Sequence, residues 1–372
     1  SASSNNNNHL FIQDQTPYRN SISLYALQQI SSEYSVPQTM YEYAKDYINS
    51  KIILGSSSHS YLDACNSEIN LTNDITKYLS KFSKSIAYFS SSPDEEVAHG
   101  FLYNHNQCQA NELRKGIQNY SDEYQYLTDI CEFCIEHSIG IVIRLHPRLG
   151  HDKRGVKHVS SSLSTFKDLI LHYSDHIYLV NPSDNLSSYW LASLVDHNLI
   201  FKSSIGIDLL MLGISVSAPN CGDSLTYNGF PFMNNKIEAN KQSWLLSNLS
   251  LSNKESIPHH LVYYAIRAFY INSLADKFIL PTPDEVFTNS FDKDLLVENN
   301  FNFIIESIKI GTSIKLPKFR GYWTYNDFTS STKSYLSWLF KTVYPALNIS
   351  NNRAQILLDK QILALKTISQ AT

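Results

Sequence analysis

The chain has 372 residues, of which 43% are hydrophobic and 17% are charged, and its formal net charge is −4. A chain of this length forms about two domains with a substantial core, and its small negative charge excludes overall attraction to nucleic acid. Its longest apolar runs are too short to span a bilayer, and residues 1–8 are a polar Ser/Asn tract without signal-peptide features. We therefore expect a cytoplasmic protein that meets the inner face of a membrane only through partners.

Residues 1–84 contain few strand patterns. Apolar residues at three- and four-residue spacing predict helices over residues 21–34 and 38–48. Residues 51–55 fit a short strand, and residues 73–82 fit another helix. This region is too short and too poor in strands for a complete nucleotide-binding domain. Two alternatives stay open: a helical cap, or a first domain that is reduced or missing.

Residues 85–235 have a different pattern, in which short apolar strands alternate with helical segments. Helices are predicted over residues 122–137, 164–173 and 187–195, and after Ser204, between strands that begin near Ser85, Gly140, His176, Leu199 and Ile214. Such alternation predicts βαβ units and a doubly wound parallel sheet. The expected fold class is therefore α/β, with residues 85–235 as a Rossmann-like domain.

Residues 236–372 have helical periodicity and no second sheet pattern. The expected helices cover residues 258–275, 292–310, 331–344 and 353–368. The prediction divides the chain into an N-terminal helical or reduced region (1–84), the central domain (85–235) and a C-terminal helical region (236–372).

The five cysteines do not have the spacing of a disulfide framework or of a zinc site. Cys131 and Cys134 form a C-x-x-C pair, but they lie in a helical segment and no second pair accompanies them. We therefore interpret them as buried helix cysteines in a reducing compartment.

A basic, His-containing turn follows the second predicted strand. In open α/β sheets, ligands bind outside the carboxyl ends of the strands. His146 and Arg148 lie at such an end, on a turn that Pro147 stiffens, and both side chains can hydrogen-bond phosphate oxygens. The alternative is a solvated basic loop with a structural histidine.

Ser203 and Ser204 lie between the fourth strand and the helix that follows it. The start of a helix offers unpaired backbone N–H groups to an anion, and either serine also serves as an ordinary N-cap. Asp208 lies one turn further along, where it can accept hydrogen bonds from ribose hydroxyls. Its alternative role is to compensate the helix dipole.

Asp94 and Glu95 follow the first strand, in a turn that is dense in carboxylates. Either can act as a general base, and the alternative is a solvated acidic turn. Pro182, after the third strand, is a candidate for the nucleotide side of the site. The phosphate site consists of cations and hydrogen-bond donors, which repel a metal ion, and the acidic turn has no D-x-D pattern. We therefore expect neither a metal nor a cofactor.

Three motifs together resemble bacterial surface-polysaccharide glycosyltransferases: residues 87–95 (AYFSSSPDE), 144–148 (RLHPR) and 202–216 (KSSIGIDLLMLGISV). The chain is similar to the nucleotide-binding half of GT-B enzymes, in particular capsule (Kdo-type) transferases and sialyltransferases with His-Pro and Ser-Ser motifs. Teichoic-acid glycerophosphotransferases carry a similar arrangement. The resemblance covers residues 85–232.

This resemblance implies that His146 and the serine pair hold the donor phosphate. It also implies that Asp208 takes the ribose-binding role that a glutamate usually fills in GT-B enzymes. Asp94 or Glu95, after the first strand, matches a position at which some of these families have an acidic residue. The related groups mostly use cytidine-activated donors, so the implied reaction transfers a CMP-linked sugar, such as Kdo or a sialic-acid-like sugar, to a surface polysaccharide or glycolipid. The alternatives are a non-catalytic scaffold protein of polysaccharide assembly and a CDP-polyol glycerophosphotransferase.

Overall fold

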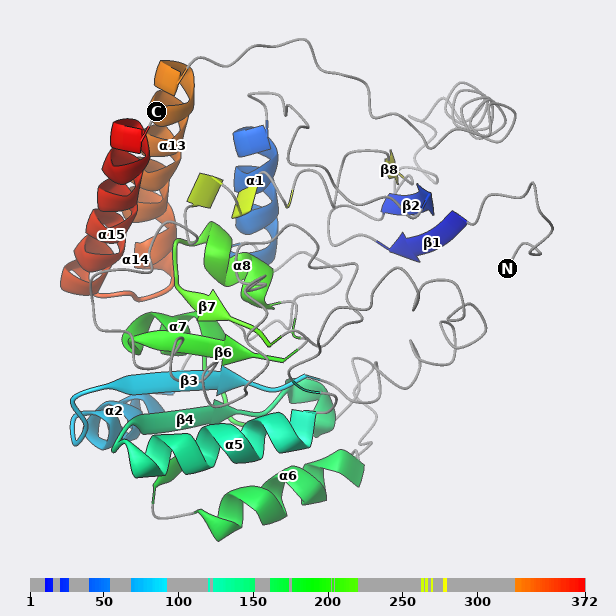
Figure 1. Ribbon diagram of the computed structural model, residues 1–372, viewed down its shortest axis with the longest axis vertical. Coiled ribbons are helices and arrows are strands. Elements are labelled where there is room, and N and C mark those ends of the chain that lie inside the picture. The colour runs from blue at the N-terminus through cyan, green and yellow to red at the C-terminus, as the bar shows by residue number, and fades with distance from the viewer. Residues whose placement is uncertain are drawn as a thin grey trace.

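The computed structural model describes residues 11–15, 21–26, 40–53, 68–91, 120, 123–150, 161–173, 176–201, 203, 205–219, 262–263, 265–266, 269, 277–279 and 325–371. The statements below concern these residues. Figure 1 shows a parallel sheet between layers of helices, with the C-terminal helices beside it.

The central sheet has five parallel strands in the order β5-β4-β3-β6-β7. In chain order they are β3 (Ser85–Phe89), β4 (Gly140–Arg144), β5 (Ile177–Val180), β6 (His197–Ile200) and β7 (Val216–Ser217). Every residue of β3, β4 and β6 is buried, as expected for parallel strands that are covered on both faces. The predicted parallel sheet is confirmed.

Helices cover both faces of this sheet, as the alternating pattern predicted. Alternate residues of β3 separate the two layers: Ile86 and Tyr88 pack with α5 (Glu123–Glu136) and α6 (Ser161–His172). Ala87 and Phe89 join the opposite core, to which α7 (Ser188–Leu194) and α8 (Ile205–Met211) contribute. Because side chains alternate along a strand, one short strand supplies both cores.

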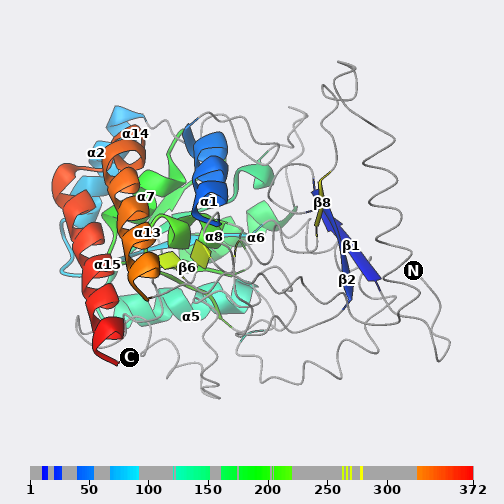
Figure 2. The same cartoon turned by 90° about the horizontal axis from the view of Figure 1, so that it is seen from above.

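The second core extends well beyond the sheet's own helices. It includes residues of α1 (Met40–Ile48), α2 (Ile69–Leu79) and the π-helix η1 (Asn49–Ile53). The C-terminal elements also join it: α13 (Tyr325–Trp338), the π-helix η5 (Leu339–Val343), α14 (Tyr344–Ala346) and α15 (Asn351–Ala371). Figure 2 shows α1, α8 and α13 on one side of the molecule, and α1 contacts α13 directly. The three predicted regions therefore share one hydrophobic core.

The helix predicted over residues 21–34 is wrong over its described part, residues 21–26. Within residues 21–34, the structure has the strand β2 (Ser21–Ala26), which pairs antiparallel with β1 (Phe11–Gln15) and β8 (Lys277–Ile279). Ser and apolar residues alternate over residues 21–24, which is a strand period. β8 also shows that the C-terminal region does contribute to a sheet. The N- and C-terminal additions are therefore not purely helical.

The strand expected over residues 51–55 is also wrong over its described part, residues 51–53. The chain continues from α1 into η1, with Ile48 and Ile52 both buried in the core. Residues four apart lie on the same face of a helix, so these two isoleucines extend the buried face of α1. The helix predicted over residues 73–82 is present, but it begins earlier, at Ile69.

The C-x-x-C pair matches its interpretation. Cys131 and Cys134 are free, buried cysteines on α5. Burial raises the pKa of Cys131 to about 12 and that of Cys134 higher still, so both thiols stay protonated at neutral pH. In the part of the chain that the structure describes, none of the helices has the length and apolar character to cross a membrane.

Candidate functional site

The strand order places a switch point between β3 and β6. From β3 the chain builds outward to β4 and β5, and then returns to the other side of β3 to form β6 and β7. Ligands of doubly wound sheets bind in the crevice at such a point, outside the carboxyl ends of the strands. Ser90 follows β3, His146 follows the neighbouring β4, and Ser203 follows β6. These three residues mark the candidate site.

Ser90 joins the ends of β3 and β4. Its backbone N–H donates to the carbonyl of Arg144 at 3.1 Å, and its Oγ accepts a hydrogen bond from the backbone N–H of His146 at 2.8 Å. Ser90 is buried, whereas His146 is partly exposed. The backbone of His146 is thus held at the same edge of the sheet at which β3 ends.

Glu123, the first residue of α5, braces the chain just beyond Ser90. Its Oε1 accepts hydrogen bonds from the Tyr88 hydroxyl at 2.6 Å and from the backbone N–H of Ser91 at 2.7 Å. The carboxylate is buried, with 6% of the residue exposed. The sequence reasoning did not single out Glu123; the available signal was an acidic residue in the first turn of a helix.

Arg144, the last residue of β4, is buried with 6% exposed. Its guanidinium donates to the backbone carbonyls of Asn181 and Asp184 in the turn after β5. The same turn closes on itself, because Oδ2 of Asp184 accepts from the backbone N–H of Asn181 at 2.6 Å. Burial lowers the pKa of Arg144 to about 10, and the Asp184 charge opposes this shift. Arg144 therefore stays cationic at neutral pH.

Pro182 belongs to this braced turn. It is buried, and a Cβ placed on Gly150 would lie 3.0 Å from the Pro182 Cβ. Gly150 ends the short 3-10 turn η2 (Pro147–Leu149) that follows His146. The absence of a side chain at Gly150 therefore lets the turns after β4 and β5 pack together. A nucleotide contact of Pro182 stays a prediction.

The remaining predicted residues are only partly described. Ser203 is partly exposed, and its carbonyl accepts from the Gly206 N–H at 3.3 Å at the start of α8. Arg148 lies in η2, but its side chain is outside the described residues, as are Asp94, Glu95 and Ser204. Their predicted roles stay predictions.

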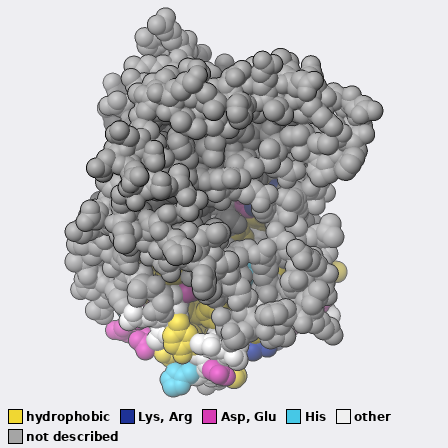
Figure 3. Space-filling model, turned by 90° about the vertical axis from the view of Figure 1, so that its right-hand side faces the viewer, with side chains coloured by type: hydrophobic (Ala, Val, Ile, Leu, Met, Phe, Trp, Pro, Cys, Tyr) yellow, Lys and Arg dark blue, Asp and Glu magenta, His cyan; other side chains and the backbone are white. Residues whose placement is uncertain are grey.

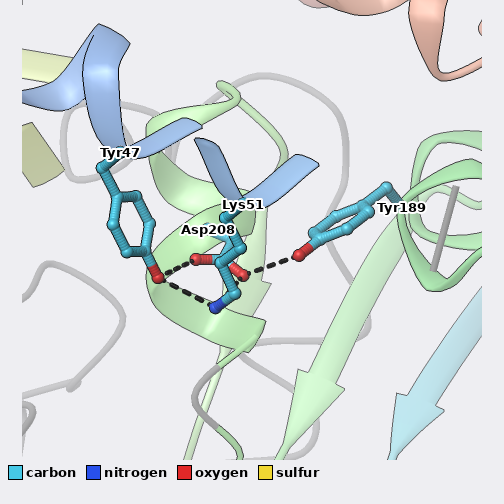
Figure 4. A network of polar contacts seen from close by, with 4 residues as sticks. All are labelled: Tyr47, Lys51, Tyr189 and Asp208. Carbon is cyan, nitrogen blue, oxygen red and sulfur yellow. Dashed lines mark hydrogen bonds and ion pairs between the residues drawn. The ribbon is translucent and has the colours of Figure 1, made fainter. Parts of the chain in front are cut away.

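Asp208 lies in the first turn of α8 and is the centre of a buried polar network (Figure 4). Oδ1 accepts from the Tyr47 hydroxyl at 2.8 Å, and Oδ2 accepts from the Tyr189 hydroxyl at 2.9 Å. Lys51 Nζ lies 2.8 Å from Oδ2 and forms an ion pair with it. Only 1% of Asp208 is exposed. We call these four residues, Tyr47, Lys51, Tyr189 and Asp208, the Asp208 quartet.

This geometry does not support the expected ribose contact of Asp208. Both carboxylate oxygens already accept hydrogen bonds from protein groups, so a ribose hydroxyl would have to displace them. The sequence reasoning missed the three partners of Asp208. The one local signal was Lys51, which directly precedes the apolar run Ile52-Ile53-Leu54, since a buried lysine needs an acceptor.

Among the described residues, no group of three or more His, Cys, Asp or Glu side chains is placed to hold a metal ion. On the face shown in Figure 3, the described side chains that are visible at the lower end mix hydrophobic, acidic and histidine groups. Comparisons of the chain with protein-family models, with curated proteins and with solved structures found no match.

Proposed function

We propose that this protein is a glycosyltransferase that moves a sugar from a nucleotide donor, of the CMP-linked class, to a bacterial surface polysaccharide or glycolipid. The observation that carries the proposal is the shared edge at the switch point. Ser90, His146 and Ser203 follow three adjacent parallel strands, where sheets of this kind bind nucleotides.

The residues at this edge suit a donor phosphate. His146 with Arg148 supplies cationic or hydrogen-bond donor groups, and Ser203 with Ser204 supplies hydroxyls. In the proposed reaction the acceptor oxygen attacks the anomeric carbon, and the bond from that carbon to the phosphate oxygen breaks. The electron pair leaves with CMP, and Asp94 or Glu95 takes the acceptor proton. Donor groups aimed at the departing phosphate stabilise the charge that develops on it.

The bracing of the edge supports this proposal. Ser90, Glu123 and Arg144 each bond the backbone of a turn at a carboxyl end of the sheet. Turns that are held before a ligand arrives lose less conformational freedom on binding, so more of the interaction energy appears as affinity. The arrangement therefore suits a reaction that depends mainly on positioning.

Calorimetric titration of the full chain with CMP, CDP and UDP tests the proposal. We expect CMP to bind in buffer and in EDTA, and His146→Ala to weaken binding by about 10- to 100-fold, which corresponds to about 1–3 kcal/mol. The matched control is His172→Ala, because His172 is exposed on α6. The proposal fails if no nucleotide binds, or if His146→Ala binds like the parent protein.

Turnover separates the proposed reaction from its alternatives. Release of CMP from a CMP-linked sugar, with a glycan or glycolipid acceptor present, is the expected outcome. Release of CMP from a CDP-polyol but not from a CMP-linked sugar indicates a glycerophosphotransferase instead. Binding without release from either donor indicates a scaffold protein with a retained nucleotide pocket.

A further inference from the structure

The Asp208 quartet joins parts of the chain that are distant in sequence. Tyr47 and Lys51 come from α1 and η1, Tyr189 comes from α7, and Asp208 comes from α8. Tyr47 and Asp208 are 161 residues apart. Figure 4 shows the Tyr47 and Tyr189 hydroxyls reaching the carboxylate from opposite sides, with Lys51 beside it.

The hydrogen bonds of the quartet run in one direction, from Lys51 toward Asp208. Lys51 donates to the Tyr47 hydroxyl at 2.8 Å, and Tyr47 in turn donates to Asp208. Burial, with the Asp208 charge, raises the pKa of Tyr47 well above its ordinary value, so its hydroxyl stays protonated. One positive and one negative charge offset each other, with 8% of Lys51 and 1% of Asp208 exposed.

The helix that carries Asp208 is short and is held at both ends. α8 has seven residues, which is too few for independent stability. Beyond its carboxyl end, the Tyr335 and Tyr344 hydroxyls donate to the carbonyls of Met211 and Leu212 at 3.3 and 2.8 Å. Its first turn is fixed through Asp208, and the Gly206 N–H links that turn to Ser203 at 3.3 Å.

We propose that Lys51 is a positioning residue, which acts through Asp208 to hold the first turn of α8 and, with it, the turn at Ser203 in the geometry that nucleotide binding requires. For its effect on nucleotide binding, the inference rests on the proposed function. By this inference, residues 40–53 contribute to the donor site, although no residue of this segment was predicted to belong to that site.

The energetics of a buried ion pair allow positioning to be separated from stability. Removal of one partner is strongly destabilising, because it leaves an unpaired charge in the interior. Replacement of both partners by apolar residues of similar volume is often neutral. In the Asp208 quartet, an apolar residue in place of Asp208 would also remove the acceptor of the Tyr47 and Tyr189 hydroxyls, so a double variant that tests the ion pair keeps an oxygen acceptor there.

Hydrogen exchange of the backbone amides of residues 205–212 tests the inference directly. We compare Lys51→Met, which removes the cation and keeps Asp208 with its two tyrosine donors, and the double variant Lys51→Met/Asp208→Asn, which removes both charges and keeps an oxygen acceptor at this position. Both variants are expected to unfold cooperatively. The α8 amides should nevertheless exchange about tenfold faster than in the parent protein, whereas the β4 amides should exchange at the parent rate. The matched control is Lys45→Met, because the Lys45 side chain is 26% exposed and its partner among the described residues is Glu42 on the same helix.

Nucleotide affinity supplies the second readout. The dissociation constant for CMP should rise about tenfold in both variants and stay at the parent value in the control. Parent-like exchange of the α8 amides in both variants overturns the inference. If the parent protein binds no nucleotide, the proposed function fails, and the exchange experiment still decides whether the quartet holds α8.

Discussion

Buried charged side chains shape the candidate site at the scale of single residues. Arg144, Glu123 and Lys51 are each less than a tenth exposed, and each bonds an atom of another element. Burial of a charge without partners is costly, so these side chains persist only because their partners are in place. The turns at the carboxyl edge of the sheet are therefore fixed by side chains beneath them as well as by their own backbone.

Arg144→Met is expected to lower the free energy of unfolding by about 3 kcal/mol, because it leaves the carbonyls of Asn181 and Asp184 without their buried donor. Urea denaturation measures the loss. The control Lys167→Met changes an exposed lysine on α6 and should stay within about 0.5 kcal/mol of the parent protein. Equal midpoints for the two variants would show that the guanidinium does not brace this turn.

At the scale of elements, three of the described helices end in the same motif, with Ser138 after α5, Gly213 after α8 and Asn348 after α14 at its left-handed position. At the end of α8, the backbone N–H groups of Gly213 and Ile214 donate to the backbone carbonyls of Leu210 and Leu209, at 3.0 and 2.8 Å. The pattern repeats after α5, where Ser138 takes the position of Gly213. The φ angles are 71° at Gly213 and 54° at Ser138, so both are left-handed, and only glycine adopts that conformation without steric cost.

We expect Gly213→Ala to destabilise the protein by about 1–2 kcal/mol, because an L-residue in the left-handed region brings its Cβ close to the backbone. The new Cβ would also lie 3.3 Å from Cγ of Gln361. Ser138→Ala is the matched control, since that position already carries a side chain at positive φ, and its stability should be nearly unchanged. A denaturant midpoint for Gly213→Ala equal to that of Ser138→Ala contradicts the argument.

At the scale of the whole molecule, the sheet shares its core with residues 40–53 and with the C-terminal helices. Arg353 of α15 donates to the backbone carbonyls of Ser193 and Val195, at the end of α7. Gln361, also on α15, accepts from the Val262 N–H at 3.0 Å. These bonds and the shared apolar cluster make the C-terminal helices a layer of the α/β unit.

A fragment of residues 85–235 is therefore expected to lack a cooperative unfolding transition. It loses α1, α2, α13 and α15, which contribute to the second core, and it exposes the core residues that these helices bury. Near-UV circular dichroism during heating compares the fragment with the full chain, for which we expect a single transition. A cooperative transition in the isolated fragment would show that residues 85–235 form an independent domain.

Three features could be predicted from the amino-acid sequence alone: the parallel sheet, the helices that connect its strands, and the buried cysteine pair of α5. These features depend on local periodicity, because the spacing of apolar residues within one segment indicates whether it forms a helix or a strand and which face is buried. His146 and Ser203 were also predictable as residues at strand ends, since the carboxyl ends of parallel strands meet at one edge of a sheet.

The partners of the polar side chains, in contrast, depend on contacts between distant parts of the chain. Asp208 has the same local sequence whether it binds a ribose or a lysine, and its partner Tyr47 lies 161 residues away. In the same way, β2 is a strand because β1 and β8 pair with it, and residues 51–53 are helical because Ile52 and Lys51 find buried partners. The local spacing of apolar residues limits the secondary structures that a segment can adopt, whereas contacts with distant segments decide which of them it adopts.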